Sequence, residues 1–139
     1  MKITELSIGD WVRYDRGTDA VQIMGIYVRN NQECVVMSDS YFPDGVIGFV
    51  EHISPIPLTP KILEKNGWHD YISKYNDDVE DVCYENGDII AHSFSSIYFK
   101  GGEYYFGEES GYFKTLTIKY VHQLQNALRL AGVEKEIII

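Results

Sequence analysis

The segment His122-Gln123-Leu124-Gln125-Asn126 resembles a zinc-protease motif in its spacing. Such a protease needs two histidines four residues apart on one helical face, with a glutamate between them as general base. Asn126 stands where the second histidine is required, and Gln123 stands where the glutamate is required. A neutral amide is a poor zinc ligand and cannot accept a proton near neutral pH. We therefore interpret the segment as the polar face of a helix and predict no bound zinc.

The acidic residues 76–81 suggest a calcium loop by composition. An EF-hand loop needs oxygen ligands at alternate positions, a glycine at its sixth position and a glutamate at its twelfth. Asp81 occupies the sixth position, so nothing supplies the sharp turn. Because runs of like charge repel one another and favour solvent, we interpret this segment as a solvated loop.

The other reactive side chains form no recognisable catalytic set. His69 and Asp70 are adjacent, so on a strand they point to opposite faces and cannot act as a pair. Cys83 is a candidate nucleophile only if folding brings a base to it, and an unpaired cysteine is more often buried in a strand. Neither a Gly-x-Ser-x-Gly elbow nor a P-loop is present. The four histidines are dispersed and lack metal-spaced partners: His52, His69, His92 and His122.

Charge and composition exclude several classes of partner. The 139 residues carry 12 Lys and Arg against 21 Asp and Glu, a formal charge of −9. Residues 1–57 have four basic and eight acidic side chains, and residues 58–139 have eight and thirteen. Both halves therefore repel nucleic acid and anionic membranes, and no basic patch compensates. No apolar run reaches the ~20 residues of a membrane span, no signal core is visible, and two cysteines make no disulfide framework. We predict a cytoplasmic protein that binds neither nucleic acid nor membrane.

The first 57 residues read as short strands separated by turns. Apolar runs lie at Trp11–Tyr14 and at residues 21–29, 34–37 and 46–50, and Pro43-Asp44-Gly45 has strong turn chemistry. So few short strands cannot build two large sheets. A small, strongly curved SH3-like β-barrel is the economical closure, because closing the sheet removes exposed edges. We predict this barrel for residues 1–57.

The pattern of residues 58–139 predicts a second subdomain of the α+β class. We expect it to form one evolutionary unit with residues 1–57. A short helix begins with Thr59 as cap and Pro60 at its first position. A two-residue turn at 101–102 pairs Lys100 with Glu103, so that Ile97, Phe99, Tyr104 and Phe106 share one face. Asn86-Gly87 is a type I′ hairpin signal, and pairing Tyr84 with Ile89 would place Glu85 opposite Asp88, so we predict the hairpin and leave its exact register open. An amphipathic helix over residues 120–131, which Gly132 ends, covers the antiparallel sheet.

Aromatic side chains are the candidate contacts with a protein partner. Tyrosine and tryptophan offer a large contact area at low entropic cost. Core packing is the alternative for each of the four candidates: Trp11, Tyr14, Tyr27 and Tyr41. The apolar tail Ile137-Ile138-Ile139 either adds to the sheet of its own chain or docks on a neighbouring chain, which makes it the candidate route to a homo-oligomer.

Three segments carry a family resemblance. They are Leu6-Ser7-Ile8-Gly9-Asp10-Trp11-Val12, the stretch from Ile53-Ser54-Pro55-Ile56-Pro57-Leu58-Thr59-Pro60 through Gly67-Trp68, and Tyr120-Val121-His122-Gln123-Leu124-Gln125-Asn126. Together they resemble a group of small proteins of gut Bacteroidales bacteria and their phages and mobile elements. Asp10 stands where that group usually has asparagine, Trp68 stands where it usually has phenylalanine, and the tail after Gly132 differs.

The resemblance implies a phage or mobile-element context and no particular activity. With an empty motif search, the sequence favours a non-enzymatic protein-interaction module without a cofactor or metal. The alternative is a small hydrolase or nuclease whose site is assembled from dispersed Asp, Glu and His side chains.

Overall fold

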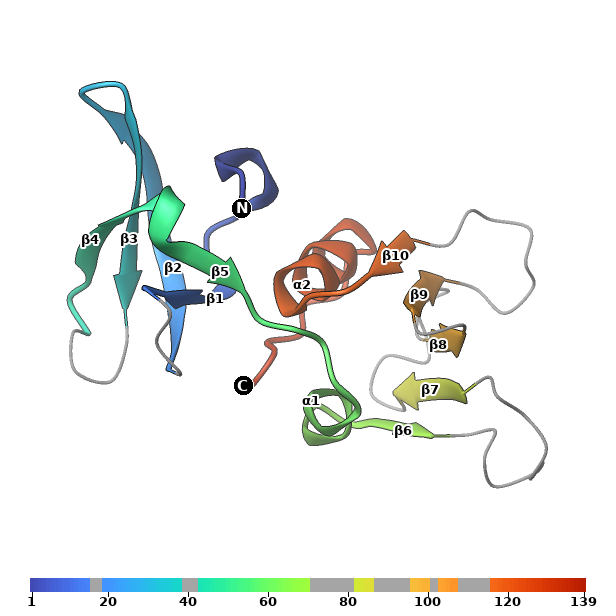
Figure 1. Cartoon of the computed structure of the whole chain (residues 1–139). Coiled ribbons are helices and arrows are strands. Elements are labelled where there is room, and N and C mark those ends of the chain that lie inside the picture. The colour runs from blue at the N-terminus through green and yellow to red at the C-terminus, as the bar shows by residue number, and fades with distance from the viewer. Residues whose placement is uncertain (16–18, 39–42, 71–81, 87–95, 101–102, 108–115) are drawn as a thin grey trace. The chain divides into compact units, whose positions relative to one another are not determined.

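The computed structural model describes residues 1–15, 19–38, 43–70, 82–86, 96–100, 103–107 and 116–139 (Figure 1). The chain is an α+β protein with two antiparallel five-stranded sheets, which confirms the predicted fold class at that level. Two compact units are formed. The N-terminal unit consists of Met1–Pro57 with Tyr120–His122, and the C-terminal unit of Leu58–Lys119 with Gln123–Ile139. Among the helices in the described ranges, none has the length and apolar character needed to cross a bilayer.

The sheet of the N-terminal unit has the strand order β4-β3-β2-β1-β5, and all of its neighbours are antiparallel. Short 3₁₀ turns lie at Ile3–Glu5 and, between the last two strands, at Val50–His52. Figure 1 shows β4 at the outer end of the sheet. The strands are β1 (Trp11–Tyr14), β2 (Ala20–Arg29), β3 (Gln32–Ser38), β4 (Val46–Phe49) and β5 (Ile53–Pro55).

The β2–β3 hairpin turns at Asn30-Asn31, where both residues have positive φ angles of 51° and 62°. A two-residue turn with this geometry is type I′, whose twist matches that of the flanking strands. Asparagine tolerates the left-handed region better than most residues. The turn therefore fixes the register in which Arg29 pairs with Gln32 and Tyr27 pairs with Cys34.

One face of this sheet forms the core of the N-terminal unit. Eight buried apolar residues make up the cluster, and Tyr14 and Ile26 pack against it. Gly48 of β4 belongs to this face, because a Cβ added there would lie 2.5 Å from the Met37 Cε and 2.5 Å from the Tyr14 ring. The buried members are Leu6, Val12, Val21, Ile23, Val35, Met37, Val50 and Ile53.

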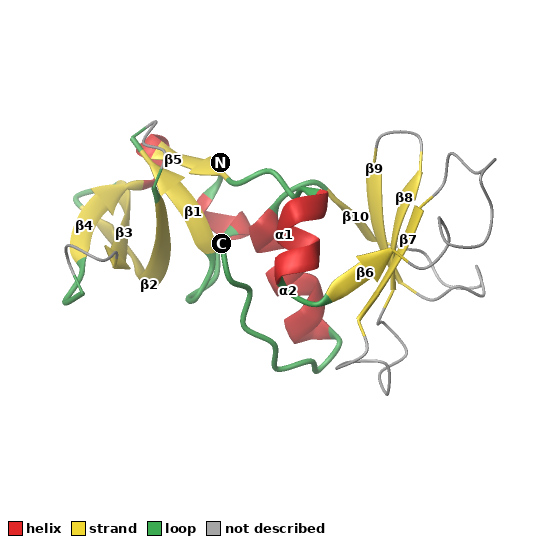
Figure 2. Ribbon diagram, turned by 90° about the horizontal axis from the view of Figure 1, so that it is seen from below, coloured by secondary structure: helices red, strands yellow, loops and turns green. Residues whose placement is uncertain are grey.

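The C-terminal unit contains a second sheet with the order β10-β9-β8-β7-β6. Figures 1 and 2 both show α1 and α2 on the same side of this sheet. Residues Gln123 onwards of α2 belong to this unit. Its elements are α1 (Pro60–Lys65), β6 (Trp68–Asp70), β7 (Val82–Asn86), β8 (Ser96–Lys100), β9 (Glu103–Gly107), β10 (Leu116–Ile118) and α2 (Val121–Leu130).

The β8–β9 hairpin confirms the predicted register. Lys100 pairs with Glu103 and Phe99 pairs with Tyr104, while Ile97 pairs with Phe106 and is fully buried. The hairpin predicted at Asn86-Gly87, whose register the sequence leaves open, continues into residues 87–89, which lie outside the described residues. Tyr84 pairs with Ile97 on one side and with Asp70 on the other, so both of its edges are occupied. The apolar run of β8 is a better cross-strand partner than a register that opposes two carboxylates.

The residues that begin α1 and the residue that ends α2 are those that the sequence predicts. The Thr59 Oγ1 accepts a hydrogen bond from the Ile62 N–H, and Pro60 occupies the first turn of α1. After α2, Gly132 has a φ of 72°, and the Val133 N–H donates to the Leu128 carbonyl, which is the six-to-one bond of a Schellman motif. The prediction that residues 122–126 form the polar face of a helix is partly wrong, because His122 and Gln125 are buried.

The C-terminal tail docks on its own chain, at the end of α1. The Asn66 Oδ1 accepts from the Ile138 N–H at 2.8 Å, and the Asn66 Nδ2 donates to the Ile138 carbonyl at 2.8 Å. The same amide nitrogen also donates to the Ile62 carbonyl, while Ile137 is fully buried. The tail is therefore held by its backbone and by one isoleucine side chain, and it adds no strand to the sheet.

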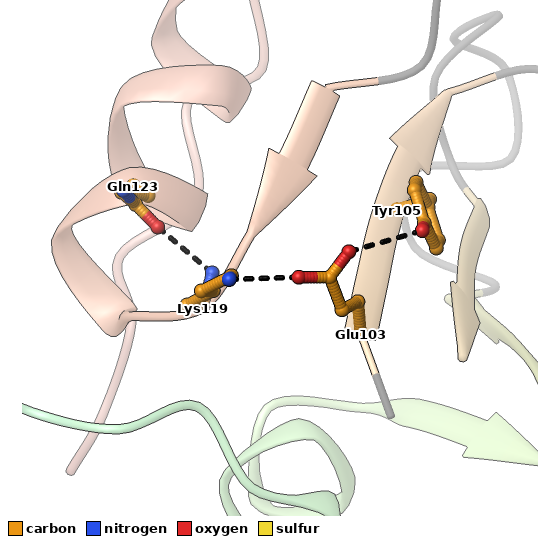
Figure 3. A network of polar contacts seen from close by, with 4 residues as sticks. All are labelled: Glu103, Tyr105, Lys119 and Gln123. Atoms are coloured by element: carbon orange, nitrogen blue, oxygen red, sulfur yellow. Dashed lines mark hydrogen bonds and ion pairs between the residues drawn. The ribbon is translucent and has the colours of Figure 1, made fainter. Parts of the chain in front are cut away.

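A polar network joins β9 to the residues around the start of α2 (Figure 3). The Lys119 Nζ lies 2.7 Å from the Glu103 Oε1, and the Tyr105 hydroxyl donates to the Glu103 Oε2. The Gln123 Oε1 accepts from the Lys119 N–H. Hydrogen bonds from Lys119 and Tyr105 hold the pKa of Glu103 below its ordinary value. The network links β9 to the residues around the start of α2 within the C-terminal unit.

Candidate protein-binding surface

The register of the N-terminal sheet collects apolar side chains on the face opposite the core. A bulge between Ile23 and Gly25 inserts Met24 as an extra residue, so β2 changes the phase of its alternation there. Beyond the bulge, one cross-strand row joins Tyr27, Cys34 and Phe49, and the next joins Gly25, Val36 and Ile47. We call the surface formed by Met24, Tyr27, Cys34, Val36, Ile47 and Phe49 the outer face.

Met24 belongs to the same surface as the two rows. A Cβ added at Gly45 would meet the Val36 Cγ1 at 2.8 Å and the Met24 Sδ at 3.5 Å. Gly45 has a φ of 91° and sits immediately before β4. The turn at Gly45 therefore places the start of β4 next to both Val36 and Met24. Met24 is thus contiguous with the apolar side chains of the two rows.

Three of the six outer-face side chains are exposed to solvent, Tyr27 and Val36 are partly buried, and Cys34 is buried. Ile47 is 56% exposed, Met24 is 46% exposed and Phe49 is 38% exposed. On the inner face, by contrast, Ile23 and Met37 are almost completely buried. Contiguous exposed apolar surface on a folded domain marks a site of interaction.

The outer face ends at an unpaired strand edge. β4 pairs with β3 on one side, and no other strand in the described part of the chain pairs with its second side. The four residues Val46–Phe49 include no lysine, arginine or proline. Natural sheets usually protect their edges with such residues because an open edge accepts another strand. β4 lacks that protection.

A surface pocket lies where β4 ends. It has a volume of about 220 Å³. One part of its wall comes from the tip of the β2–β3 hairpin, and the other part comes from residues 49–51. Two of its lining side chains are carboxylates, Glu33 and Glu51, and one is the Phe49 ring. The full lining is Asn31, Gln32, Glu33, Phe49, Val50 and Glu51. A cationic group with an apolar stem fits this combination of charge and ring.

The four predicted partner contacts are placed differently from one another. Tyr27 lies in the outer face, in the row with Cys34 and Phe49. Trp11 is half-buried on the side of β1 opposite Val12. Tyr14 packs against the core, with its ring edge-on to that of His52 at 5.9 Å. Tyr41 lies outside the described residues.

The described histidines show no assembled catalytic centre around them. The His52 Nδ1 lies 3.8 Å from the Asp15 Oδ1, and its Nε2 lies 3.6 Å from the Glu51 Oε1, on an exposed part of the surface. Within the described ranges, no three His, Cys, Asp or Glu side chains are grouped so that they could hold a metal ion. Cys34 and Cys83 are both buried, and neither is in a disulfide. His92 and the acidic residues 76–81 lie outside the described residues.

His122 is the most perturbed titratable group of the N-terminal unit. It is 3% exposed, its Nδ1 has no hydrogen-bond partner, and its ring stacks on Tyr120 at 5.8 Å. Burial lowers the pKa of His122, and the N-terminal amine acts in the same direction, while Asp10 and Glu5 oppose them. The imidazole is therefore held in its neutral form, which a buried group without a full set of partners prefers.

This perturbation predicts that the N-terminal unit loses stability on acidification. The pKa of His122 in the folded state is below its value in the unfolded state. The stability that the neutral imidazole contributes is therefore fully present above the unfolded pKa, and it is lost as the pH falls through the folded pKa. Urea unfolding from pH 7 down to about pH 5 should show this loss. His122→Phe should reduce the slope of the unfolding free energy against pH. His52→Gln, which changes an exposed histidine, is the control and should keep the wild-type slope. An unchanged slope in His122→Phe would contradict the assignment.

Sequence reasoning missed the outer face for a definite reason. β4 is apolar at all four positions, so alternation does not tell its two faces apart. The bulge at Met24 then reverses the phase along β2. The available signal was Gly48, since a glycine inside a strand often marks a close approach.

Comparisons of the chain with protein-family models, with curated proteins and with solved structures give no match.

Proposed function

We propose that this protein is a non-enzymatic interaction module that binds a partner protein through the outer face of its N-terminal sheet. The observation that carries the proposal is the in-register set of exposed apolar side chains that runs to the unpaired edge of β4. Burying such side chains stabilises a complex by roughly 25 cal/mol for each Å² of apolar surface removed from water.

The aromatic content of the surface supports a specific contact. Tyr27 and Phe49 sit in one cross-strand row, where rigid rings can anchor a partner with little loss of conformational freedom. Around them the charged side chains Glu33 and Glu51 form a polar border. An apolar centre with a charged rim is the usual anatomy of a protein interface.

We also propose that the N-terminal sheet is a small SH3-like barrel. Three observations support this description: the strand order β4-β3-β2-β1-β5, the 3₁₀ turn between β4 and β5, and the bulge that bends β2. A fourth is the approach of Gly48 to the Tyr14 ring. Those two residues lie on strands separated by two others in the sheet, so only strong curvature brings them together.

The cellular context is part of the same proposal. The resemblance to small proteins of Bacteroidales phages and mobile elements supports an accessory protein that acts on a host protein in the cytoplasm. The two buried cysteines, neither of which is in a disulfide, suit a reducing compartment. We propose no nucleic-acid or membrane partner, because the charge of −9 is spread over both halves of the chain.

Photo-crosslinking tests the proposal. A benzophenone side chain at position 47 should give a discrete adduct with one host protein, identified by mass spectrometry and suppressed by excess unlabelled protein. The matched control carries the same group in place of Leu130, which is 83% exposed in the other unit. Adding Phe49→Ser should abolish the adduct at position 47. Equal labelling from both positions, or persistence in Phe49→Ser, would refute the proposal.

A further inference from the structure

We infer that the outer edge of β4 receives an extended segment of the partner, added as a further strand, in which lysine or arginine alternates with apolar residues. This inference rests on the proposed function, because it names the occupant of the same surface. It follows from three features of the described residues: the open edge, the apolar rows beside it and the carboxylates at its end.

The open edge determines the backbone geometry of the occupant. Along a paired strand, alternate residues direct their N–H and C=O groups away from the neighbour, so β4 offers a row of unused donors and acceptors. The other edge strand of this sheet, β5, is three residues long and includes Pro55. β4 is longer and has no proline. Strand addition therefore favours β4, where backbone hydrogen bonds supply affinity and side-chain positions supply specificity.

The apolar rows determine the alternate side chains of the occupant. A strand added beside β4 continues the cross-strand rows of the outer face, next to Ile47 and next to Phe49. Side chains two residues apart on the occupant then cover these two positions. Aliphatic or aromatic groups at those places remove from water the surface that is exposed at Ile47 and Phe49.

The carboxylates determine the charge of the occupant. Glu33 and Glu51 line the pocket beside Phe49 at one end of β4, and Asp44 is exposed at the other end. Among the described basic side chains, His52 has its Nε2 3.6 Å from the Glu51 Oε1 on the exposed surface, and Arg29 lies at the hairpin tip opposite Gln32. A lysine or arginine on the occupant, at a position that alternates with the apolar ones, can reach the glutamates that line the pocket at this end of β4.

A second copy of this chain fits the edge poorly. If two copies of β4 paired antiparallel about a two-fold axis with all four strand residues paired, residue 46 would face residue 49 and residue 47 would face residue 48. Asp44 of one copy would then lie opposite Glu51 of the other, at both ends of the pair. Like charges directly opposite one another destabilise a strand pair. The same two residues attract a basic strand.

Binding of designed peptides tests the inference without altering the protein. The probe is the labelled peptide Thr-Val-Lys-Ile-Arg-Val-Lys-Thr, capped at both ends. Its first control replaces every Lys and Arg by Glu, and its second carries N-methyl groups on alternate amides, so it cannot pair as a strand. We expect the basic peptide to bind at least about tenfold more tightly than either control, because the charge pairs and the backbone bonds are both lost.

Matched variants of the protein locate the site. Glu33→Lys with Glu51→Lys should weaken binding of the basic peptide by about tenfold and strengthen binding of the acidic one. Ile47→Lys should weaken both, because it places a charge on the exposed edge. Leu130→Lys and Glu134→Lys change an exposed leucine and an exposed glutamate elsewhere in the chain, so they should leave the affinity unchanged.

The outcomes separate this inference from the proposed function. Equal binding of basic and acidic peptides, both weakened by Phe49→Ser, would overturn the inference and leave the proposed function standing. Absence of peptide binding together with a specific adduct at position 47 would do the same. A wild-type dimer that Ile47→Lys dissociates in sedimentation would show that a second copy is the occupant. Loss of both the peptide binding and the adduct would overturn both proposals.

Discussion

Replacing Trp68 by alanine is expected to lower the free energy of unfolding of the C-terminal unit by about 3–5 kcal/mol, the range for large core side chains. Trp68 opens β6, pairs with Asn86 and is fully buried. Lys135 lies over its ring, with its Nζ 5.8 Å from the centroid. Alanine would leave a cavity that the surrounding strands fill only in part.

Trp68→Phe is the matched control for this change. Phenylalanine keeps an aromatic ring and much of the volume, so we expect a cost of about 1–2 kcal/mol. Urea unfolding followed by circular dichroism measures both variants. Equal losses in Trp68→Ala and Trp68→Phe would contradict a packing role and point to the indole nitrogen instead.

Replacing Asn66 by alanine is expected to destabilise the C-terminal unit by about 2–4 kcal/mol, because three hydrogen bonds are lost and their partners are left behind. The Asn66 side chain bonds the Ile138 N–H, the Ile138 carbonyl and the Ile62 carbonyl. It is 5% exposed, so water does not readily replace these bonds. We also expect the C-terminal tail to detach from the end of α1 in this variant.

Amide hydrogen exchange at Ile138 reports the detachment directly. In the wild-type protein this amide should exchange slowly, and in Asn66→Ala it should approach the rate of an unstructured chain. Lys65→Met is the control, since it removes only the exposed contact of the Lys65 Nζ with the Ile139 carbonyl. Full protection of Ile138 in Asn66→Ala would show that Ile137 alone holds the tail.

Local signals were read correctly where the chemistry of a few adjacent residues decides the structure. Thr59 and Pro60 begin α1, and Gly132 ends α2, because capping depends on residues within one turn. The two-residue turn after Lys100 fixes the β8–β9 register for the same reason.

Long-range pairing explains the failures. Nothing near Tyr84 in the sequence indicates that it lies between Asp70 and Ile97. Asn66 looked like an ordinary residue before a helix-ending glycine, and its role depends on a segment 72 residues away. His122 belonged to an apparently polar helix face, yet it is buried against residues of the N-terminal unit. Such contacts arise only from the complete fold.

Amide hydrogen exchange on the N-terminal sheet, with and without the basic peptide, tests the central claim most directly. The account predicts that amides of Val46–Phe49 become slower to exchange when the peptide is present, while those of Ile53 and Ser54 on the opposite edge do not change. Protection at β5 with none at β4, or protection confined to the C-terminal unit, would contradict it.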